Sequence, residues 1–332
     1  MYLQILLTNF TDSISANLKT ILNHRLVHYG FMTIMLLFIS LIVAGPEVLF
    51  VRQLSAYLLH IMLGLFALGF VFLFTGFEKL MLMSFAACAV LCVFIKNQSN
   101  GELVYPKDND TEKISVCHIN LSNVLEVENM ASQLKNNDID LISFQELTPE
   151  WADFLESSLA SDYPHRYQSV RIDPYGKAFY SRYPIRVTDT LSRSYAFDLA
   201  LEVIKNGQSY NLVSTYLTPS LNGNSLTMAR SQMKNISQYV LSHPKKAIVL
   251  GEFNMVYWSD EIRQFRETTH LRNSRKDVIP ASLRAPFDHV FYSDDLQCVA
   301  LKDMMLSRKD RIGIFAAFQQ NIDQSHRPHK FY

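Results

Sequence analysis

Three long apolar runs occupy the first hundred residues and limit what this part of the chain can become. They are LVHYGFMTIMLLFISLIVAG (Leu26 to Gly45), LSAYLLHIMLGLFALGFVFLFTG (Leu54 to Gly76) and LMLMSFAACAVLCVFI (Leu80 to Ile95). The first two carry no Asp, Glu, Lys or Arg and approach the roughly 20 residues that cross a bilayer. A buried helical hairpin of a water-soluble protein is the competing interpretation, but two adjacent uncharged runs this long are uncommon in water. We predict that residues 1–97 form a membrane region with two or three transmembrane helices.

The third run decides between two and three spans. It is shorter than the others and is bracketed by Glu78 and Lys79 on one side and by Lys96 on the other. It spans if the flanking side chains snorkel, and otherwise lies as a re-entrant or interfacial segment. Both alternatives stay open at this point.

Basic residues near the runs indicate an orientation. Lys19 and Arg25 precede the first run, whereas Arg52 follows it. This is a slight positive-inside preference for a cytoplasmic N-terminus. With three spans the C-terminal part then lies outside the cytoplasm, and with two spans the side is reversed.

Charge and cysteine content exclude little. Lys plus Arg and Asp plus Glu each number 31, so no overall basic field favours a nucleic-acid partner, although a local site for one is not excluded. Cys88 and Cys92 lie one helical turn apart within the third run, where we predict that they pack as small side chains. Cys117 and Cys298 have no metal-type spacing.

The chain turns polar at residues 98–113, which we predict to be a linker, and strand and helix patterns then alternate. Strands are predicted at residues 114–120, 139–144, 177–181, 199–204, 210–217, 246–251, 288–293 and 312–318. Helices are predicted around residues 124–134, after Pro149, and at 226–241 and 259–267. This mixture predicts one layered α/β domain over residues 114–320. We expect the basic tail, residues 321–332, to be disordered.

Several predicted strands begin or end on polar residues that a core does not need. They are Asn120, Gln145, Glu146, Tyr216, Glu252, Asn254, Asp288, Asp310 and Arg311. Carboxylates and amides gathered at one edge of a sheet make an oxygen-rich site, and Mg²⁺ prefers such ligands. Taken singly, each residue is better explained as part of a turn or cap. His289 follows Asp288 on an apolar strand and is predicted to be a core histidine.

The order of seven segments resembles the endonuclease/exonuclease/phosphatase superfamily. The segments are HINLSN, LISFQELTPEW, YGKAFYSRYPI, STYLTPS, VLGEFNMVYWS, FDHVFYS and KDRIGIFAAF, from about Ser115 to Phe318. In particular the chain resembles bacterial members with a membrane-spanning N-terminal segment. The resemblance implies a four-layer α/β sandwich with the site at one edge of two packed sheets, preceded by an α-helical transmembrane segment.

The resemblance also assigns roles to the polar residues by position. Asn120 and Glu146 would hold the divalent metal, Mg²⁺, with Glu146 as a direct ligand. Tyr216 falls where the family has a histidine that touches the phosphate. Asn254 matches the asparagine that contacts the phosphate.

The remaining positions depart from the family pattern. Glu252 replaces the aspartate that helps to orient the attacking water, and Asp288 matches the aspartate that orients the catalytic histidine. Aligning KDRIGIFAAF with the family's Ser-Asp-His-Xaa-Pro ending keeps Asp310. It places Arg311 where the histidine should be and Gly313 where the proline should be.

These departures predict weak chemistry. A histidine can exchange a proton near neutral pH, whereas the pKa of arginine lies above about 12. Tyr216 is neutral near pH 7, and Glu252 moves its carboxylate by one methylene, when a shift of about 1 Å can cost on the order of a hundredfold in rate. We hypothesise that Arg311 instead closes the site as an ion network with Asp288 and Asp310.

Three functions follow as alternatives. The first is a membrane-anchored member of this superfamily, ancestrally a Mg²⁺-dependent phosphoesterase, whose hydrolysis is impaired. The second is an active divalent-metal-dependent phosphodiesterase or phosphatase in which Glu252 or Asp310 positions the water and Arg311 stabilises charge on the phosphate. The third is a non-catalytic module that binds a lipid headgroup or a protein. We expect a multi-pass protein of the bacterial inner membrane and a phosphorylated lipid or another phosphoester as the ligand.

Overall fold

The computed structural model describes residues 25–45, 48–98, 103, 112–191, 196–275, 285–307 and 310–321. The chain divides into two compact units, Met1–Lys96 and Asn97–Tyr332. The predicted linker lies outside the described residues except at residues 98, 103, 112 and 113, and the predicted tail lies outside them except at residue 321. The domain boundaries given above stay a prediction.

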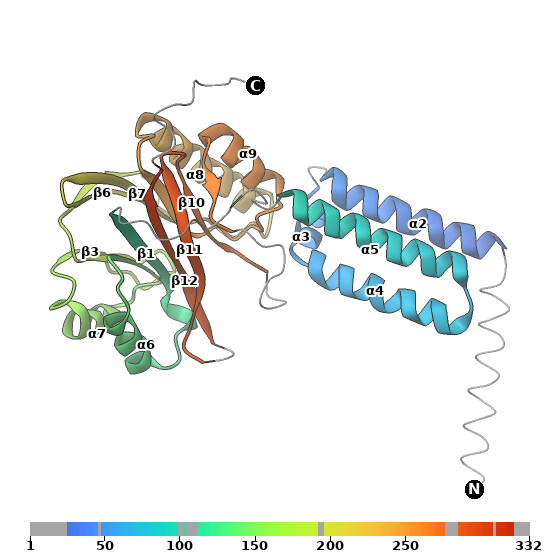
Figure 1. Ribbon diagram of the computed structural model, residues 1–332, viewed down its shortest axis with the longest axis horizontal. Coiled ribbons are helices and arrows are strands. Elements are labelled where there is room, and N and C mark those ends of the chain that lie inside the picture. The colour runs from blue at the N-terminus through green and yellow to red at the C-terminus, as the bar shows by residue number, and fades with distance from the viewer. Residues whose placement is uncertain are drawn as a thin grey trace, which may run out of the picture. The chain divides into compact units, whose positions relative to one another are not determined.

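The N-terminal unit is helical (Figure 1). Its helices are α2 (Arg25–Ala44), α3 (Leu49–Ala56), α4 (Leu58–Thr75) and α5 (Glu78–Gln98). Among the described residues, α2, α4 and α5 are long and apolar enough to cross a membrane. The helix of the third run takes in its charged flanks and reaches 21 residues, which is the length that the apolar stretch alone lacked. The second predicted run is divided at Tyr57 into α3 and α4.

The second unit contains two six-stranded sheets (Figure 1). The first has the order β11-β12-β1-β2-β4-β3 and the second the order β5-β6-β7-β8-β10-β9. The strands of the first are β1 (Lys113–Asn120), β2 (Leu141–Gln145), β3 (His165–Ser169), β4 (Lys177–Ser181), β11 (Leu296–Met305) and β12 (Arg311–Gln320). Those of the second are β5 (Ile185–Thr190), β6 (Leu199–Lys205), β7 (Gln208–Tyr216), β8 (Ala247–Glu252), β9 (Arg272–Asn273) and β10 (Asp288–Tyr292).

Each sheet is mixed in the same way. Its central pair, β1 with β2 or β7 with β8, is parallel, and its other pairings are antiparallel. A parallel pair needs a crossover, and helices supply it. α6 (Val127–Asn136) connects β1 to β2, and α8 (Gly223–Ser242) connects β7 to β8. Within each sheet the two central strands end at the same edge, and a hydrogen bond from Asn120 at the end of β1 to Glu252 at the end of β8 shows that the two edges meet.

Helices cover the outer faces of the two sheets. α6 and α7 (Pro149–Leu159) pack on the first sheet, and α8 and α9 (Asp260–Thr269) lie along the second (Figure 1). α7 begins as predicted at Pro149, where the N-cap Thr148 side chain accepts a hydrogen bond from the backbone N–H of Trp151.

The main core lies between the sheets. Alternate residues of the central strands point into it, among them Val116 of β1, Leu141 of β2, Leu212 of β7 and Leu250 of β8. The predicted α/β class with two packed sheets is thereby confirmed. β3, β5, β9 and β11 were not predicted from the sequence.

Candidate functional site

The predicted polar residues lie at the carboxyl ends of the central strands. Asn120 pairs with Gln145 across β1 and β2, and Tyr216 pairs with Glu252 across β7 and β8. Asp288, the first residue of the antiparallel strand β10, pairs with Glu252. Because strand side chains alternate, Asn120 lies on the same face of β1 as Val116, which faces the other sheet. The site therefore sits at one end of the interface between the two sheets.

Asn120 connects two carboxylates that are far apart in the sequence. Its Nδ2 donates to Glu146 Oε1 at 3.0 Å and to Glu252 Oε2 at 2.9 Å. Its Oδ1 accepts hydrogen bonds from Ser122 N and Ser122 Oγ, at 3.0 and 2.8 Å. These bonds fix the orientation of the amide, so Asn120 turns its nitrogen to the carboxylates. In this geometry its nitrogen positions the two carboxylates and its oxygen is engaged by Ser122. The role of Asn120 as a metal ligand, which the resemblance implies, stays a prediction.

Glu146 is held in an unusual backbone conformation. Its φ is 60°, in the left-handed region that glutamate rarely adopts. The next residue, Leu147, donates from its N–H to the Gly176 carbonyl at 3.1 Å. A Cβ at Gly176 would lie 2.2 Å from the Leu147 carbonyl oxygen, so only glycine allows the approach. Such local strain is typical of a functional segment.

The second carboxylate, Glu252, is partly buried near other acids. Burial, together with the charges of Asp288 and Glu146, raises the pKa of Glu252 above its usual value, against the hydrogen bond from Asn120. Burial and the charges of Glu252 and Glu146 also raise the pKa of Tyr216 to about 12. Tyr216 is therefore a neutral hydroxyl near pH 7.

Asn254 lies just beyond Glu252 but faces the backbone. Its Nδ2 donates to the Leu217 carbonyl at 2.8 Å, and its φ of 52° is left-handed. Its side chain thus ties the segment after β8 to the segment after β7. Asn254 therefore lies at the edge of the site. Because its Nδ2 bonds to the backbone, its amide oxygen is the group that a ligand would contact.

Arg311 forms a partly buried ion network beside Glu252. Its Nη1 donates to Asp288 Oδ2, and its Nε donates to Asp303 Oδ1 at 2.8 Å. The Arg311 and Asp288 side chains are 17% and 10% exposed. Burial opposes both charges, but their mutual attraction prevails, so the pKa of Arg311 is raised and that of Asp288 is lowered. Arg311 Nη2 is buried without a hydrogen-bond partner in the described part of the chain.

The predicted pairing of Arg311 with Asp288 is present, whereas the pairing with Asp310 is wrong. Asp310 accepts a hydrogen bond from Ser307 Oγ, and its carbonyl accepts one from Leu306 N at 2.9 Å. It therefore closes the turn between β11 and β12. Asp303 of β11 takes the expected place beside the guanidinium.

Beneath the site lies a polar layer that sequence reasoning missed, formed by His118, Ser143, Lys177, Asp198, Ser214 and Thr215. All six side chains are at most 2% exposed. Ser143 Oγ lies 3.2 Å from His118 Nδ1 and 2.8 Å from Ser214 Oγ. A signal was present, because His118 and Lys177 interrupt the apolar positions of predicted strands.

The centre of the polar layer is a buried ion pair. Lys177 Nζ lies 3.6 Å from Asp198 Oδ1 and donates to the Phe197 carbonyl at 2.5 Å. Thr215 Oγ1 donates to Asp198 Oδ1 at 2.6 Å. Burial lowers the pKa of Lys177 and raises that of Asp198, and their mutual attraction opposes both changes. The pair joins β4 of the first sheet to the segment before β6 of the second.

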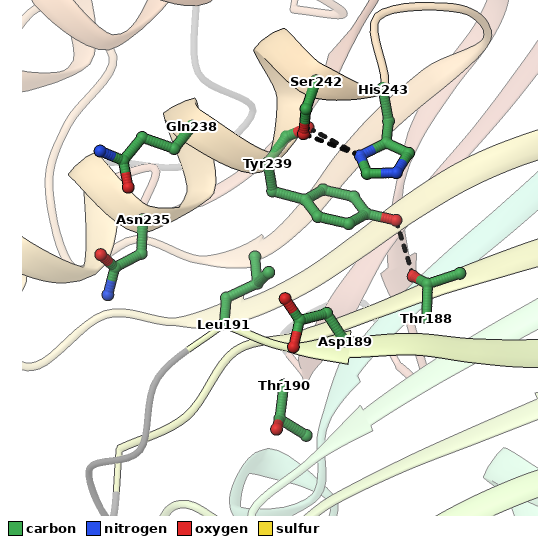
Figure 2. Close-up of a pocket in the computed structure, with 9 residues that line it drawn as sticks. All are labelled: Thr188, Asp189, Thr190, Leu191, Asn235, Gln238, Tyr239, Ser242 and His243. Carbon is green, nitrogen blue, oxygen red and sulfur yellow. Dashed lines mark hydrogen bonds between the residues drawn. The ribbon is translucent and has the colours of Figure 1, made fainter.

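A separate pocket of about 520 Å³ lies between β5 and α8. Figure 2 shows its lining, in which the Tyr239 hydroxyl lies 2.7 Å from Thr188 Oγ1 and the His243 ring stacks on Tyr239. None of the predicted site residues lines it. It is therefore distinct from the carboxylate site.

The donor set of the site fits a divalent metal of the magnesium type. No three His, Cys, Asp or Glu side chains form a metal-holding group among the described residues. Glu146 and Glu252, joined through Asn120, offer two carboxylates, and Mg²⁺ is commonly held by one or two carboxylates with water and substrate oxygens.

Comparison with known proteins agrees with this architecture. A model of the Endonuclease/Exonuclease/phosphatase family matches residues 119–303, more than half of the chain. No curated protein matches the sequence. Two similar solved structures are endonuclease/exonuclease/phosphatase proteins from Bacteroides thetaiotaomicron and Bacteroides vulgatus. The first has 11% identity and a TM-score of 0.50, covering 64% of this chain and 100% of that one. The second has 14% identity and a TM-score of 0.50, covering 63% and 100%.

A third similar structure is D. rerio TDP2 complexed with a single-strand DNA product. It has 18% identity and a TM-score of 0.47, and the match covers 63% of this chain and 100% of that one. At these identities the two Bacteroides structures support the fold alone.

Proposed function

The chain belongs to the endonuclease/exonuclease/phosphatase family, and we propose that its second unit contains a site that binds a divalent metal and a phosphoester. We propose further that the unit is anchored at a membrane and that hydrolysis at the site is weak or absent. The family is one of metal-dependent phosphoesterases. The anchor consists of α2, α4 and α5, which are long and apolar enough to cross a bilayer. The bacterial inner membrane and an extracytoplasmic position of the second unit stay predictions.

The ligands that we propose for Mg²⁺ are Glu146 and Glu252. Asn120 positions both carboxylates, as its two hydrogen bonds support. When bound, the metal would polarise a phosphoryl oxygen and offset its negative charge. The buried Arg311 Nη2 is the donor that a phosphate oxygen would satisfy, whereas the Asn254 amide oxygen, at the same edge, would contact the ligand through a hydroxyl or a water.

The observation that carries the proposal is the double pairing of Arg311. The resemblance implies histidine at this position, and the pKa of Arg311 is raised further by Asp288 and Asp303. The guanidinium therefore stays charged and takes up no proton from an attacking water. Tyr216, at the second position where histidine is implied, is neutral and offers one hydroxyl.

A second candidate is an active phosphoesterase that uses Glu252 as its base. It is favoured by the raised pKa of Glu252, because a carboxyl group tuned upwards by burial is better suited to accept a proton near neutral pH. Asp310 has no part in this alternative, since it closes the β11–β12 turn. The non-catalytic binding module is the limiting case of the first proposal, in which no turnover remains.

Turnover by the full chain in detergent micelles separates these functions. The substrates are bis-p-nitrophenyl phosphate, DNA, inositol phosphates and sphingomyelin, each with Mg²⁺ or Mn²⁺. We expect little or no metal-dependent release of product. Robust turnover that Glu146→Gln abolishes would contradict the proposal of impaired hydrolysis and support an active enzyme. Glu150→Gln is the matched control, because Glu150 is an exposed glutamate on α7.

Restoring the implied residues tests the cause of the impairment. The triple variant Tyr216→His, Arg311→His, Glu252→Asp should gain metal-dependent turnover of bis-p-nitrophenyl phosphate. Circular dichroism shows whether the variant has folded. A folded triple variant without turnover would show that Arg311 and Tyr216 are not what limits hydrolysis.

A further inference from the structure

The most exposed apolar side chains of the second unit are concentrated on three loops. Among its described residues, Ile172 is 94% exposed, Leu125 78% and Leu221 73%. The other exposed large apolar side chains of this unit are between 37% and 51% exposed. Single exposed apolar residues are ordinary. Here the three extremes lie on loops at one edge of the unit.

All three loops leave the edge of the unit at which the carboxylate pair lies. Leu125 follows Asn120 by five residues, in the segment between β1 and α6. Ile172 lies in the β3–β4 loop, where Arg171 N donates to the carbonyl of Leu147, the residue after Glu146, at 3.0 Å. Leu221 lies in the β7–α8 loop. The first residue of this loop, Leu217, donates from its backbone N–H to the Glu252 carbonyl at 3.0 Å. We call Leu125, Ile172 and Leu221 the apolar rim.

The charged residues that flank Ile172 in the β3–β4 loop neutralise each other. Arg171 and Asp173, on either side of Ile172, pair with each other through two hydrogen bonds of 2.7 and 2.5 Å. Asp173 also accepts from Tyr175 N at 3.1 Å, which holds the loop in shape. The hydroxyl oxygen of Tyr175 in turn lies 3.5 Å from Thr218 Oγ1 of the β7–α8 loop. The two loops thus support each other beside Tyr216.

The same chain supplies a reason for a lipid surface to be near. Three of its helices are long and apolar enough to cross a membrane. Leu103, five residues after the end of α5, is already part of the core between the two sheets. Few residues therefore separate the last candidate span from the folded core of the second unit.

We infer that the apolar rim inserts into the lipid bilayer surface and presents the phosphoester of a membrane lipid headgroup to Glu146 and Glu252. The substrate class rests on the proposed function, whereas insertion of the rim does not. A water-soluble phosphoester would gain nothing from a rim of isolated leucine and isoleucine side chains. A bilayer removes those side chains from water and leaves the headgroup phosphates at the level of the site.

Insertion is measured with the full chain in phosphatidylcholine vesicles. Ile172→Trp adds a fluorophore at the rim, and phosphatidylcholine brominated along its acyl chains quenches tryptophans that enter the bilayer. The unmodified chain gives the background from Trp151 and Trp258. Ile204→Trp is the matched control, because Ile204 lies beside the β6–β7 turn, at the opposite end of β7 from Tyr216. We expect the added fluorescence to be quenched in Ile172→Trp and unquenched in Ile204→Trp. Equal quenching in both, or in neither, overturns the inference and leaves a protein partner as the occupant of the rim.

The substrate class is tested by comparing two esters. Phosphatidylcholine in the vesicles and soluble bis-p-nitrophenyl phosphate are offered to the triple variant Leu125→Asp, Ile172→Asp, Leu221→Asp. Lipid cleavage should fall by about tenfold or more, with turnover of the soluble ester unchanged. Equal effects on both esters would overturn the lipid assignment. The unmodified chain is expected to cleave neither ester strongly, so metal binding supplies the second readout. The increase in Tm caused by Mg²⁺ should be larger in phosphatidylcholine vesicles than in detergent micelles, because a headgroup phosphate would share the metal. An equal increase in both overturns the lipid assignment.

Discussion

His289 should make the second unit less stable as the pH falls from 7 to 5. Its side chain is 1% exposed, and its Nε2 lies 2.8 Å from the Met255 carbonyl oxygen. Nε2 therefore carries the proton, and Nδ1 is buried without a partner in the described part of the chain. Burial lowers the pKa of His289 to about 4, assisted by Arg275 and Arg311 and opposed by the Met255 bond and Asp288.

The sign and size of the effect follow from the two pKa values. The unfolded histidine takes up a proton near pH 6.5, whereas the folded one resists protonation until about pH 4. Protons then bind the unfolded state first, so stability is lost as the pH falls from 6.5 towards 4. Between pH 7 and pH 5 the loss in unfolding free energy is about 2 kcal/mol, since each pH unit inside the window costs about 1.4 kcal/mol. His118, whose pKa burial also lowers to about 4, adds a similar loss.

Urea unfolding of the full chain in detergent micelles measures this loss at pH 7, 6 and 5. Both tryptophans, Trp151 and Trp258, belong to the second unit, so their fluorescence reports its unfolding alone. His289→Gln keeps a donor for the Met255 carbonyl and removes the titrating nitrogen. It should reduce the loss between pH 7 and pH 5 by about 2 kcal/mol. The reasoning is refuted if the two proteins lose the same free energy over that interval, whatever their stabilities at pH 7.

Three further predictions concern the buried ion pair, the close approach of β8 to β7 at Gly251, and the metal. Asp198→Asn should lower the unfolding free energy by about 3–5 kcal/mol, because it leaves Lys177 buried without a carboxylate. Adding Lys177→Met to this variant should restore part of the lost free energy, as measured by urea unfolding. Gly251→Ala should abolish the folded peak in size-exclusion chromatography, because the new Cβ would lie 2.0 Å from the Thr215 carbonyl oxygen at a φ of 143°. Mg²⁺ should raise the Tm of the unmodified chain in differential scanning fluorimetry, and Glu146→Gln should remove that increase, since a ligand stabilises the state that binds it.

The sequence predicted strands best where both faces of a strand are buried. β8 and β10 have apolar runs between polar ends, and their predicted bounds agree with the structure to within one residue. β5 was missed because most of its side chains are exposed on an edge strand, so no apolar alternation marks it. β11, also an edge strand, mixes charged and apolar positions and contains two register shifts.

The site was predictable as far as strand ends fix it. Asn120, Glu146 and Glu252 come together because parallel strands end at one edge, and Asp288 joins them because the antiparallel strand β10 begins there. A polar residue at a strand end is visible in a sequence. Which acid meets Arg311 is not visible in this way. It depends on the register shift between Met304 and Met305, which sets β11 against β12 and brings Asp303 beside the guanidinium. Contacts between side chains of the two sheets, such as those in the polar layer, produce no recognisable spacing of residues in the sequence, so they could not be predicted.

The pairing of β1 with β12 bears on when the second unit can be completed. Lys113 lies opposite Gln319, so the first strand of this unit to emerge from the ribosome is joined by its last. Until residues 311–320 have been synthesised, one edge of β1 stays open, with backbone groups free to pair with another chain. A nascent chain whose apolar helices have already entered a bilayer would carry this open edge at the membrane surface. Translational arrest or truncation before Arg311 should therefore produce an aggregation-prone, membrane-held product, and a domain without its last strand should not accumulate in native form.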